Sequence, residues 1–206
     1  MPRLQLHLVT DSRLTLERLL AVARAAVDGG VDVVQVRAKA ASPDTLVALV
    51  RQVRAVVAGR VPVIVNGTVA TALAAGADGV QLPEGHSDLG RARQVLGPTA
   101  YVGASVHGAG AARLAEQAGV TSITFGHIYA TRSHPDEPAR GLDALKEVIA
   151  AVAIPVIAIG GIDARRVPDV IATGAAGVAV ISAVVDAGDP REAVRALRAA
   201  LDRREG

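Results

Sequence analysis

The chain has 206 residues, of which half are hydrophobic but only 1% aromatic, with 22 basic and 20 acidic side chains and no cysteine. A net charge of +2 without a basic run disfavours binding to nucleic acid. The lack of cysteine excludes disulfides, thiolate catalysis and zinc sites with cysteine ligands.

The first residues, MPRLQLHLVTD, enter an alternating strand pattern directly. They contain no apolar stretch of the length that a signal sequence or a membrane span requires. We therefore expect a cytoplasmic protein without a membrane partner. The composition predicts one domain over residues 1–206, with a core of Ala, Val, Leu and Ile.

Short runs rich in β-branched residues alternate along the chain with Ala- and Leu-rich stretches of helical spacing. The predicted strands cover residues 4–10, 31–37, 61–66, 78–82, 100–105, 122–126, 154–160 and 176–182. The predicted helices include residues 16–27, 43–57 and 69–75. Eight strands alternating with about eight helices form the pattern of a compact (β/α)8 TIM barrel, and an open, doubly wound sheet is the alternative.

The ends of the last two predicted strands carry a candidate phosphate site. Gly160 and Gly161 end the seventh strand, in IPVIAIGGI, and Ser182 ends the eighth, in AGVAVIS. Glycine allows a close approach of the backbone to a ligand, and barrels commonly bind phosphate at these two loops. The alternative is that the glycines only turn the chain.

The end of the second predicted strand carries two cations. Alternation places Gln35, Arg37 and Lys39 on one face, which is expected to look into the mouth of the barrel. Asn66 and Ser105, after the third and fifth strands, add neutral hydrogen-bonding groups at the same rim. These residues predict a site for a second anionic group, although a solvated strand end would show the same pattern.

His127 follows the sixth predicted strand and precedes a long polar loop, TRSHPDEPARG. A neutral imidazole accepts and returns a proton near pH 7, so this position predicts a proton carrier. The loop is typical of a flap that closes over a substrate. His86 and His107 also lie near the rim, but no carboxylate accompanies them at a metal-binding spacing, so we expect no metal site.

The ordered strand-end segments resemble a known family over nearly the whole chain. LHLVTD, VQVRAK, GADGVQL, GASVH, FGHIYATRSHP, IPVIAIGGI and GVAVIS are similar to the thiamine phosphate synthase/TenI family of phosphate-binding barrels. Its synthases couple a pyrimidine diphosphate to thiazole phosphate with magnesium, held by an Asp in an N-D-R turn after strand three and by another Asp after strand four. Here these positions are Gly67 and His86, and Asp88, two residues beyond His86, is the alternative carboxylate.

The sequence FGH at His127, together with LPEG and RGLDAL, resembles the TenI branch, the thiazole tautomerases. This resemblance implies an isomerase of thiamine biosynthesis that converts a carboxythiazole phosphate to its aromatic tautomer, with His127 as the catalytic residue. The resemblance also implies that the protein forms a homo-oligomer and needs no cofactor. The implied phosphate-binding residues are Gly160, Gly161, Ile181 and Ser182, and the implied substrate-binding residues are Gln35, Arg37, Lys39, Asn66, Ser105, Thr131 and Ser133.

Two alternatives to the tautomerase stay open at this point. One is a thiamine phosphate synthase with displaced metal ligands, which joins hydroxymethylpyrimidine diphosphate and thiazole phosphate and needs magnesium. The other is a non-catalytic sensor of a phosphorylated ligand, because a fold alone does not specify an activity. All three predict a phosphorylated small molecule as the partner.

Overall fold

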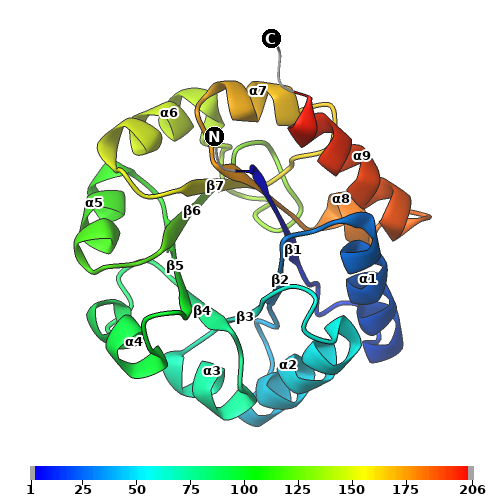
Figure 1. Cartoon of the computed structure of the whole chain (residues 1–206). Helices are drawn as coiled ribbons and strands as arrows, with labels where there is room; N and C mark the ends of the chain where they lie inside the picture. The colour runs from blue at the N-terminus through cyan, green and yellow to red at the C-terminus, as the bar shows by residue number, and fades with distance from the viewer. Residues whose placement is uncertain (1–2, 204–206) are drawn as a thin grey trace.

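The chain forms a closed barrel of parallel strands surrounded by helices. A computed structural model describes residues 3–203. Its strands β1 to β8 pair in chain order, and β8 pairs back onto β1. Figure 1 looks along the barrel and shows the ring of strands inside the ring of helices. The predicted (β/α)8 TIM barrel is confirmed, and the open sheet is wrong.

The strands are short, and each is followed by at least one helix. The strands are β1 (Gln5–Val9), β2 (Val33–Val36), β3 (Val63–Asn66), β4 (Gly79–Leu82), β5 (Tyr101–Val106), β6 (Ser122–Gly126), β7 (Val156–Ile159) and β8 (Gly177–Val180). The helices in the described part of the chain are α1 (Leu16–Gly29), α2 (Pro43–Val57), α3 (Val69–Ala75), α4 (Leu89–Leu96), α5 (Ala109–Gln117), α6 (Gly141–Ala151), α7 (Val167–Ala172), α8 (Ser182–Val185) and α9 (Pro190–Asp202).

The bounds predicted from the sequence are correct to within two residues for every strand and for the three helices given by range. One difference matters at the phosphate corner: β8 ends at Val180, and Ser182 begins the short helix α8. Ile181 leaves the extended conformation at φ −121° and ψ −85°, which ends the strand earlier than the apolar run AGVAVIS suggests. Arg37 and Lys39 likewise lie beyond the end of β2 rather than in it.

The starts of α1 and α2 follow from local side-chain capping. The Thr15 and Ser42 hydroxyls accept hydrogen bonds from the backbone N–H groups of Arg18 and Thr45, and Pro43 occupies the first turn of α2. Such caps satisfy N–H groups that lack a partner in the first turn. None of the described helices is both long and apolar enough to span a bilayer.

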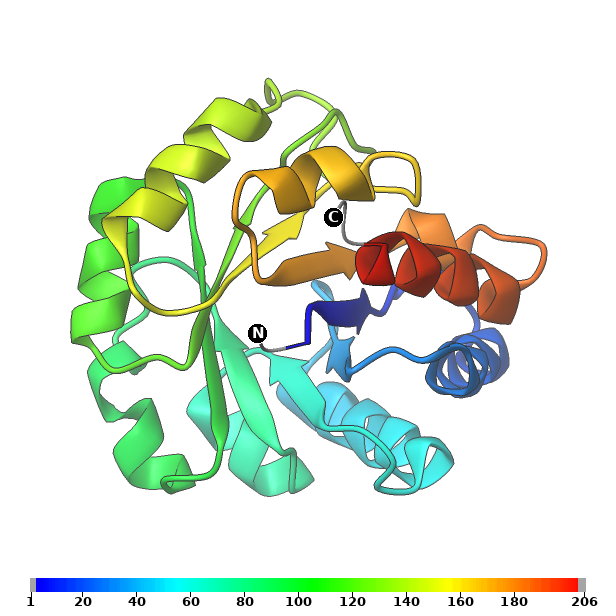
Figure 2. The same ribbon diagram turned by 45° about the horizontal axis from the view of Figure 1, so that its top comes forward.

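The barrel wall separates an apolar layer from a partly polar interior. Outward-facing strand residues such as Leu8, Val36 and Phe125 are fully buried against the helices. Figure 2, tilted by 45°, shows how the helices cover the outside of the sheet. The inward-facing residues of the same strands include His7 and Gln35, so the interior carries hydrogen-bonding groups.

The N-terminal end of the barrel is closed by polar groups that bind one another. The Tyr101 hydroxyl is hydrogen-bonded to Ser122, and the His7 ring lies 2.8 Å from the Gln5 side-chain oxygen. Asp32 pairs with Arg198 of α9 and accepts a hydrogen bond of 2.7 Å from the Leu6 N–H. Helix α9 is therefore tied to the first two strands by a largely buried ion pair.

Candidate active site

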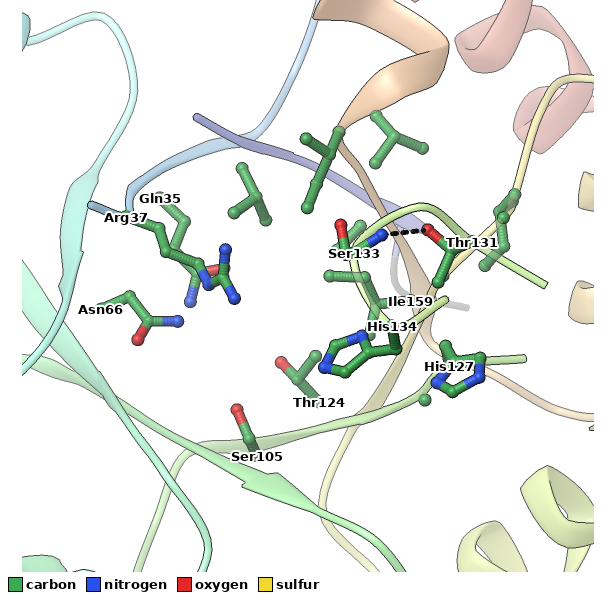
Figure 3. Close-up of a pocket in the computed structure, with 18 of the residues that line it drawn as sticks. Gln35, Arg37, Asn66, Ser105, Thr124, His127, Thr131, Ser133, His134 and Ile159 are labelled. Atoms are coloured by element: carbon green, nitrogen blue, oxygen red, sulfur yellow. Dashed lines mark hydrogen bonds between the residues drawn. The ribbon is translucent and has the colours of Figure 1, made fainter. Parts of the chain in front are cut away.

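A cavity of about 340 Å³ opens at the C-terminal ends of the strands. Figure 3 shows that its polar side chains come from opposite sides of the barrel, with Arg37 and Asn66 facing His134 and Ser133. The structure brings together every residue predicted for the site. These are Gln35, Arg37, Lys39, Asn66, Ser105, His127, Thr131, Ser133, Gly160, Gly161, Ile181 and Ser182.

The corner after β7 is built from two glycines in left-handed conformation. Gly160 has φ +103° and Gly161 has φ +65°. A Cβ atom on Gly160 would lie 2.3 Å from the Cβ of His127, so this position has no room for a side chain. The Arg166 guanidinium donates to the Gly161 carbonyl and lies 4.5 Å from the centre of the Tyr129 ring. The shape of this corner is thus held from both sides.

Arg37, which follows β2, places a cation on the side of the cavity opposite the corner after β7. The Thr10 hydroxyl accepts a hydrogen bond of 3.0 Å from the Arg37 N–H and donates one of 3.3 Å to the Arg37 carbonyl. This clamp fixes the backbone of Arg37 after the strand has ended. Burial lowers the pKa of Arg37, and the nearby carboxylate of Asp11 partly opposes that shift. An anion in the cavity would therefore restore an interaction that water no longer supplies.

Neutral groups line the cavity between these two regions. Gln81 donates a hydrogen bond of 3.1 Å to the Ser105 hydroxyl, which leaves the Ser105 O–H free to donate into the cavity. Thr124 of β6 lies beside it in the lining, and the Asn66 amide lies across from it (Figure 3). These groups suit a polar ring or a phosphate oxygen.

The loop after β6 places two imidazoles at the cavity wall. His127 is only 4% exposed, and its Nε2 lies 3.2 Å from the Glu137 carbonyl oxygen. The His134 ring stacks on the His127 ring, with centroids 5.2 Å apart and planes 4° from parallel. In Figure 3, His134 is nearer the middle of the cavity, and His127 lies to its right, farther from the middle. The predicted proton-carrying role of His127 stays a prediction, and its ring supports the loop.

The pKa of His134 is lowered, first by burial, which disfavours the charged imidazole. Lys39, His127 and Arg37 lower it further, whereas Glu137 raises it. Lys39 and Arg37 both follow β2, so the two cations of that segment act on this ring across the cavity. Burial and the neighbouring cations therefore disfavour the protonated form of the His134 ring.

A second set of polar contacts joins the loop end to β5. Arg140 donates through Nε to the Gly126 carbonyl at 2.9 Å and through Nη1 to the His107 carbonyl at 3.3 Å. Glu84 accepts a hydrogen bond of 2.6 Å from the His107 N–H, and its carboxylate lies 2.9 Å from the His107 ring nitrogen. Arg140 was not among the residues predicted for the site from the sequence. The structure places it in the cavity lining.

The positions that the family uses for magnesium do not fit that ion in this chain. Gly67 has no side chain, and the His86 ring accepts a hydrogen bond of 3.1 Å from the Asp88 N–H. Neither His86 nor Asp88 lines the cavity, so Asp88 does not replace the missing carboxylate. Within residues 3–203, no group of three His, Asp or Glu side chains is arranged to hold a metal. Magnesium needs hard oxygen ligands, which these positions lack.

Several cavity residues were not identified from the sequence. Thr124 follows from the alternation of Ser122, Thr124 and Gly126 on the inward face of β6, a signal that the sequence does contain. Glu84, Glu137 and His134 lie in loops, where no periodicity gives the direction of a side chain. Their place in the lining required the structure.

The closed barrel and the cation-bearing cavity at its mouth place the protein among the (β/α)8 barrels that bind small anionic ligands at the C-terminal ends of their strands. Residues 6–184 match a family model described as thiamine monophosphate synthase. The chain belongs to the thiamine phosphate synthase/TenI family, which confirms the resemblance drawn from its strand ends.

Individual relatives are similar along almost their whole length. The chain is 43% identical over 200 residues to a putative thiamine-phosphate synthase of Geobacter sulfurreducens, covering 95% of this chain and 93% of the relative. It is 44% identical over 197 residues to the thiamine-phosphate synthase of Methanoculleus marisnigri, covering 94% and 93%. The solved structure of thiamine phosphate pyrophosphorylase from Pyrococcus furiosus superposes with a TM-score of 0.85 at 34% identity, covering 97% and 96%.

These relatives correct the functional prediction. The thiazole tautomerase prediction is wrong, because relatives at 43% and 44% identity over nearly the whole chain are named thiamine-phosphate synthases. The prediction was wrong because it depended mainly on one residue, His127 at the end of the sixth strand. The alternative reading, a synthase, is the one that the relatives favour.

Proposed function

We propose that the protein is a transferase that makes thiamine phosphate from hydroxymethylpyrimidine diphosphate and thiazole phosphate. The observation that carries this proposal is a cavity with two separate regions for anions. The glycine corner after β7 and the start of α8 form one region, and Arg37 and Lys39 after β2 form the other. Two phosphorylated substrates that meet end to end require such an arrangement. The whole-chain similarity to named synthases supports the same reaction.

The reaction is a substitution at the methylene carbon of the pyrimidine substrate. The thiazole nitrogen attacks the methylene carbon of the pyrimidine, a C–N bond forms, and the C–O bond to the diphosphate breaks. Pyrophosphate leaves with the electron pair of that bond. Negative charge therefore grows on the leaving group, and cations beside it stabilise the transition state.

The side chains divide into two groups under this proposal. Backbone groups of Gly160, Gly161, Ile181 and Ser182 hold the phosphate of the thiazole. Arg37 and Lys39 hold the diphosphate, and the pyrimidine lies between Gln35, Asn66 and the Ser105 hydroxyl. Thr131 and Ser133 extend from the loop toward the junction of the two substrates. Holding the reactants in line supplies much of the acceleration in such displacements.

A direct assay tests the proposal. Purified full-length chain is incubated with both substrates, with each one omitted in turn, and with magnesium or with EDTA. We expect thiamine phosphate and pyrophosphate in equal amounts, and only when both substrates are present. A protein that binds thiazole phosphate but forms no product at any enzyme concentration would instead match the non-catalytic sensor, and would overturn the transferase.

A further inference from the structure

The charges around the diphosphate region are unusual for a reaction that the family performs with magnesium. Arg37 lies on one side of the cavity and His134 lies on the other, and Lys39 also belongs to the lining. Among the described residues that line the cavity, the carboxylates are Glu84 and Glu137. Glu84 already binds the His107 N–H, and Glu137 lies 3.8 Å from the Arg140 guanidinium. Both acids are thus engaged at the β4 to β6 side.

On the β3 side of the rim, Gly67 occupies the position where the family holds metal with an aspartate. Gly67 lies directly after Asn66, and its N–H donates to the Gln81 carbonyl at 3.3 Å. A Cβ atom there would meet only ordinary contacts, at 3.4 Å from Leu46 and 3.6 Å from Val65. Space for a side chain therefore exists, so packing does not explain the glycine. The donor set of this chain offers an amide and cations where a divalent ion needs oxygen anions.

We infer that this chain binds the diphosphate without a divalent cation, and that a proton taken up by His134 supplies part of the positive charge that a metal would bring. The inference rests on the proposed function for the identity of the diphosphate. It concerns only this chain's own residues, and each of its parts is measurable without turnover.

The groups around His134 explain why its ring would become protonated only when an anion binds in the cavity. The charged and titratable groups that face its ring are His127 at the end of β6, Glu137 in the same loop, and Lys39 and Arg37 after β2. Burial and the two cations hold its pKa below the ordinary value of 6.5 while the cavity contains no anion. A diphosphate between Arg37 and His134 would neutralise that repulsion and favour the protonated ring. Binding of the anion and uptake of the proton are then thermodynamically linked.

The first test is calorimetric titration of the full chain with inorganic pyrophosphate in EDTA and again in excess magnesium. We expect pyrophosphate to bind in EDTA. Excess magnesium should increase its affinity by no more than about threefold. Absence of binding in EDTA overturns the proposal, whether or not magnesium restores it. The double variant Gly67→Asp, His86→Asp serves as the comparison, because it puts carboxylates back at the two family positions and is expected to weaken pyrophosphate binding in EDTA.

The second test measures the proton. The titration in EDTA is repeated in two buffers of different ionisation enthalpy for the wild type and for His134→Lys, whose charge is permanent. Protons taken up or released by pyrophosphate itself contribute equally to both titrations, so they cancel in the difference between the two proteins. The wild type is expected to take up more protons, and its affinity is expected to fall roughly tenfold more than that of the variant between about pH 6 and about pH 8. Equal proton uptake and equal pH dependence in the two proteins would overturn the role of His134.

These outcomes separate the inference from the proposed function. A chain that binds pyrophosphate in EDTA with proton uptake through His134, but makes no thiamine phosphate, refutes the function and leaves the anion site in place. A chain that makes thiamine phosphate but binds pyrophosphate only with magnesium refutes the inference and leaves the function in place.

Discussion

The two ends of the barrel use polar side chains in opposite ways. At the N-terminal end, Arg198 donates to Asp32, to the Leu4 carbonyl at 2.8 Å and to the Gly30 carbonyl at 3.3 Å. At the C-terminal end, no hydrogen bond or ion pair within residues 3–203 engages the side chains of Arg37 or Lys39. The Arg198 guanidinium therefore has hydrogen-bond partners within the protein, whereas the Arg37 side chain points into the cavity.

This difference follows from the direction of the strands. All eight are parallel, so every connection from a strand to the next helix emerges at the same end, where loops can vary without altering the barrel. The other end receives short returns and can be closed by side chains that bind one another. Substitutions at the N-terminal end should therefore change stability, and substitutions at the C-terminal end should change binding and turnover.

The largest effect is expected from Arg198→Leu. The Arg198 side chain is only 10% exposed, and its loss leaves the largely buried Asp32 carboxylate with only the exposed side chain of Arg3 as an ion-pair partner. Breaking a buried ion pair in this way costs about 3 to 5 kcal/mol, which denaturant unfolding would measure. Arg195→Leu, on the same helix but paired at the surface with Glu192, should cost less than about 1 kcal/mol. Equal losses in the two variants would show that the N-terminal end is not held by this pair.

His7 gives a pH dependence of stability at the same end. Burial lowers the pKa of His7 from 6.5 to about 4, and Asp32 partly opposes the shift. The unfolded chain then binds more protons than the folded chain between these values, so stability falls as the pH is lowered from 6.5 to about 4 and this contribution is flat outside that window. The loss is about 3 kcal/mol by linkage.

Unfolding free energies of the wild type and His7→Gln across this window measure the contribution of His7. The variant should show the smaller slope, because Gln does not titrate. Parallel curves for the two proteins would mean that His7 is not buried as a neutral ring.

Arg37→Gln tests the open end. The substitution keeps the Thr10 clamp on the backbone, because that clamp uses the Arg37 N–H and carbonyl. It removes the cation, so kcat/KM for thiamine phosphate formation should fall about 100-fold, or ~2.7 kcal/mol of transition-state binding. The melting temperature should hardly change. Arg51→Gln, on the outer helix α2, is the control and should retain full activity.

A smaller effect is expected from Gly160→Ala. The methyl group would meet the Cβ of His127 at 2.3 Å and shift the phosphate corner, so the KM for thiazole phosphate should rise about tenfold, or ~1.4 kcal/mol. Gly30 has the same φ of +103° but open space around its Cβ position, so Gly30→Ala isolates backbone strain. That control should lose stability without a change in KM. An unchanged KM in Gly160→Ala would remove the glycine corner from the site.

The fold was predictable because the sequence repeats one pattern. Short runs rich in β-branched residues, such as 122–126, predicted the strands, and stretches of helical spacing, such as 43–57, predicted the helices. The alternation of side chains along a strand predicted that Gln35, Arg37 and Lys39 face the mouth of the barrel, and all three line the cavity although β2 ends at Val36. These inferences need only local periodicity and the parallel arrangement of the strands.

The arrangement within the site was less predictable, because it depends on contacts between distant segments. The Thr10 clamp on Arg37 joins positions 27 residues apart, and the Arg140 contact with His107 joins positions 33 apart. The direction of the His127 ring, toward its own loop at Glu137, is likewise set by packing rather than by spacing. The tautomerase prediction depended mostly on this single histidine, whereas the relatives that favour a synthase are similar over almost the whole chain.

The most direct test of the proposed function is a single-turnover experiment with the wild-type chain in excess over hydroxymethylpyrimidine diphosphate and with saturating thiazole phosphate. Quenched samples are analysed for thiamine phosphate by mass. We predict that all of the limiting diphosphate is converted, with one pyrophosphate released per thiamine phosphate, and that Arg37→Gln slows the conversion about 100-fold. Recovery of both substrates unchanged from the wild-type chain would contradict the assignment of this protein as a thiamine-phosphate-forming transferase.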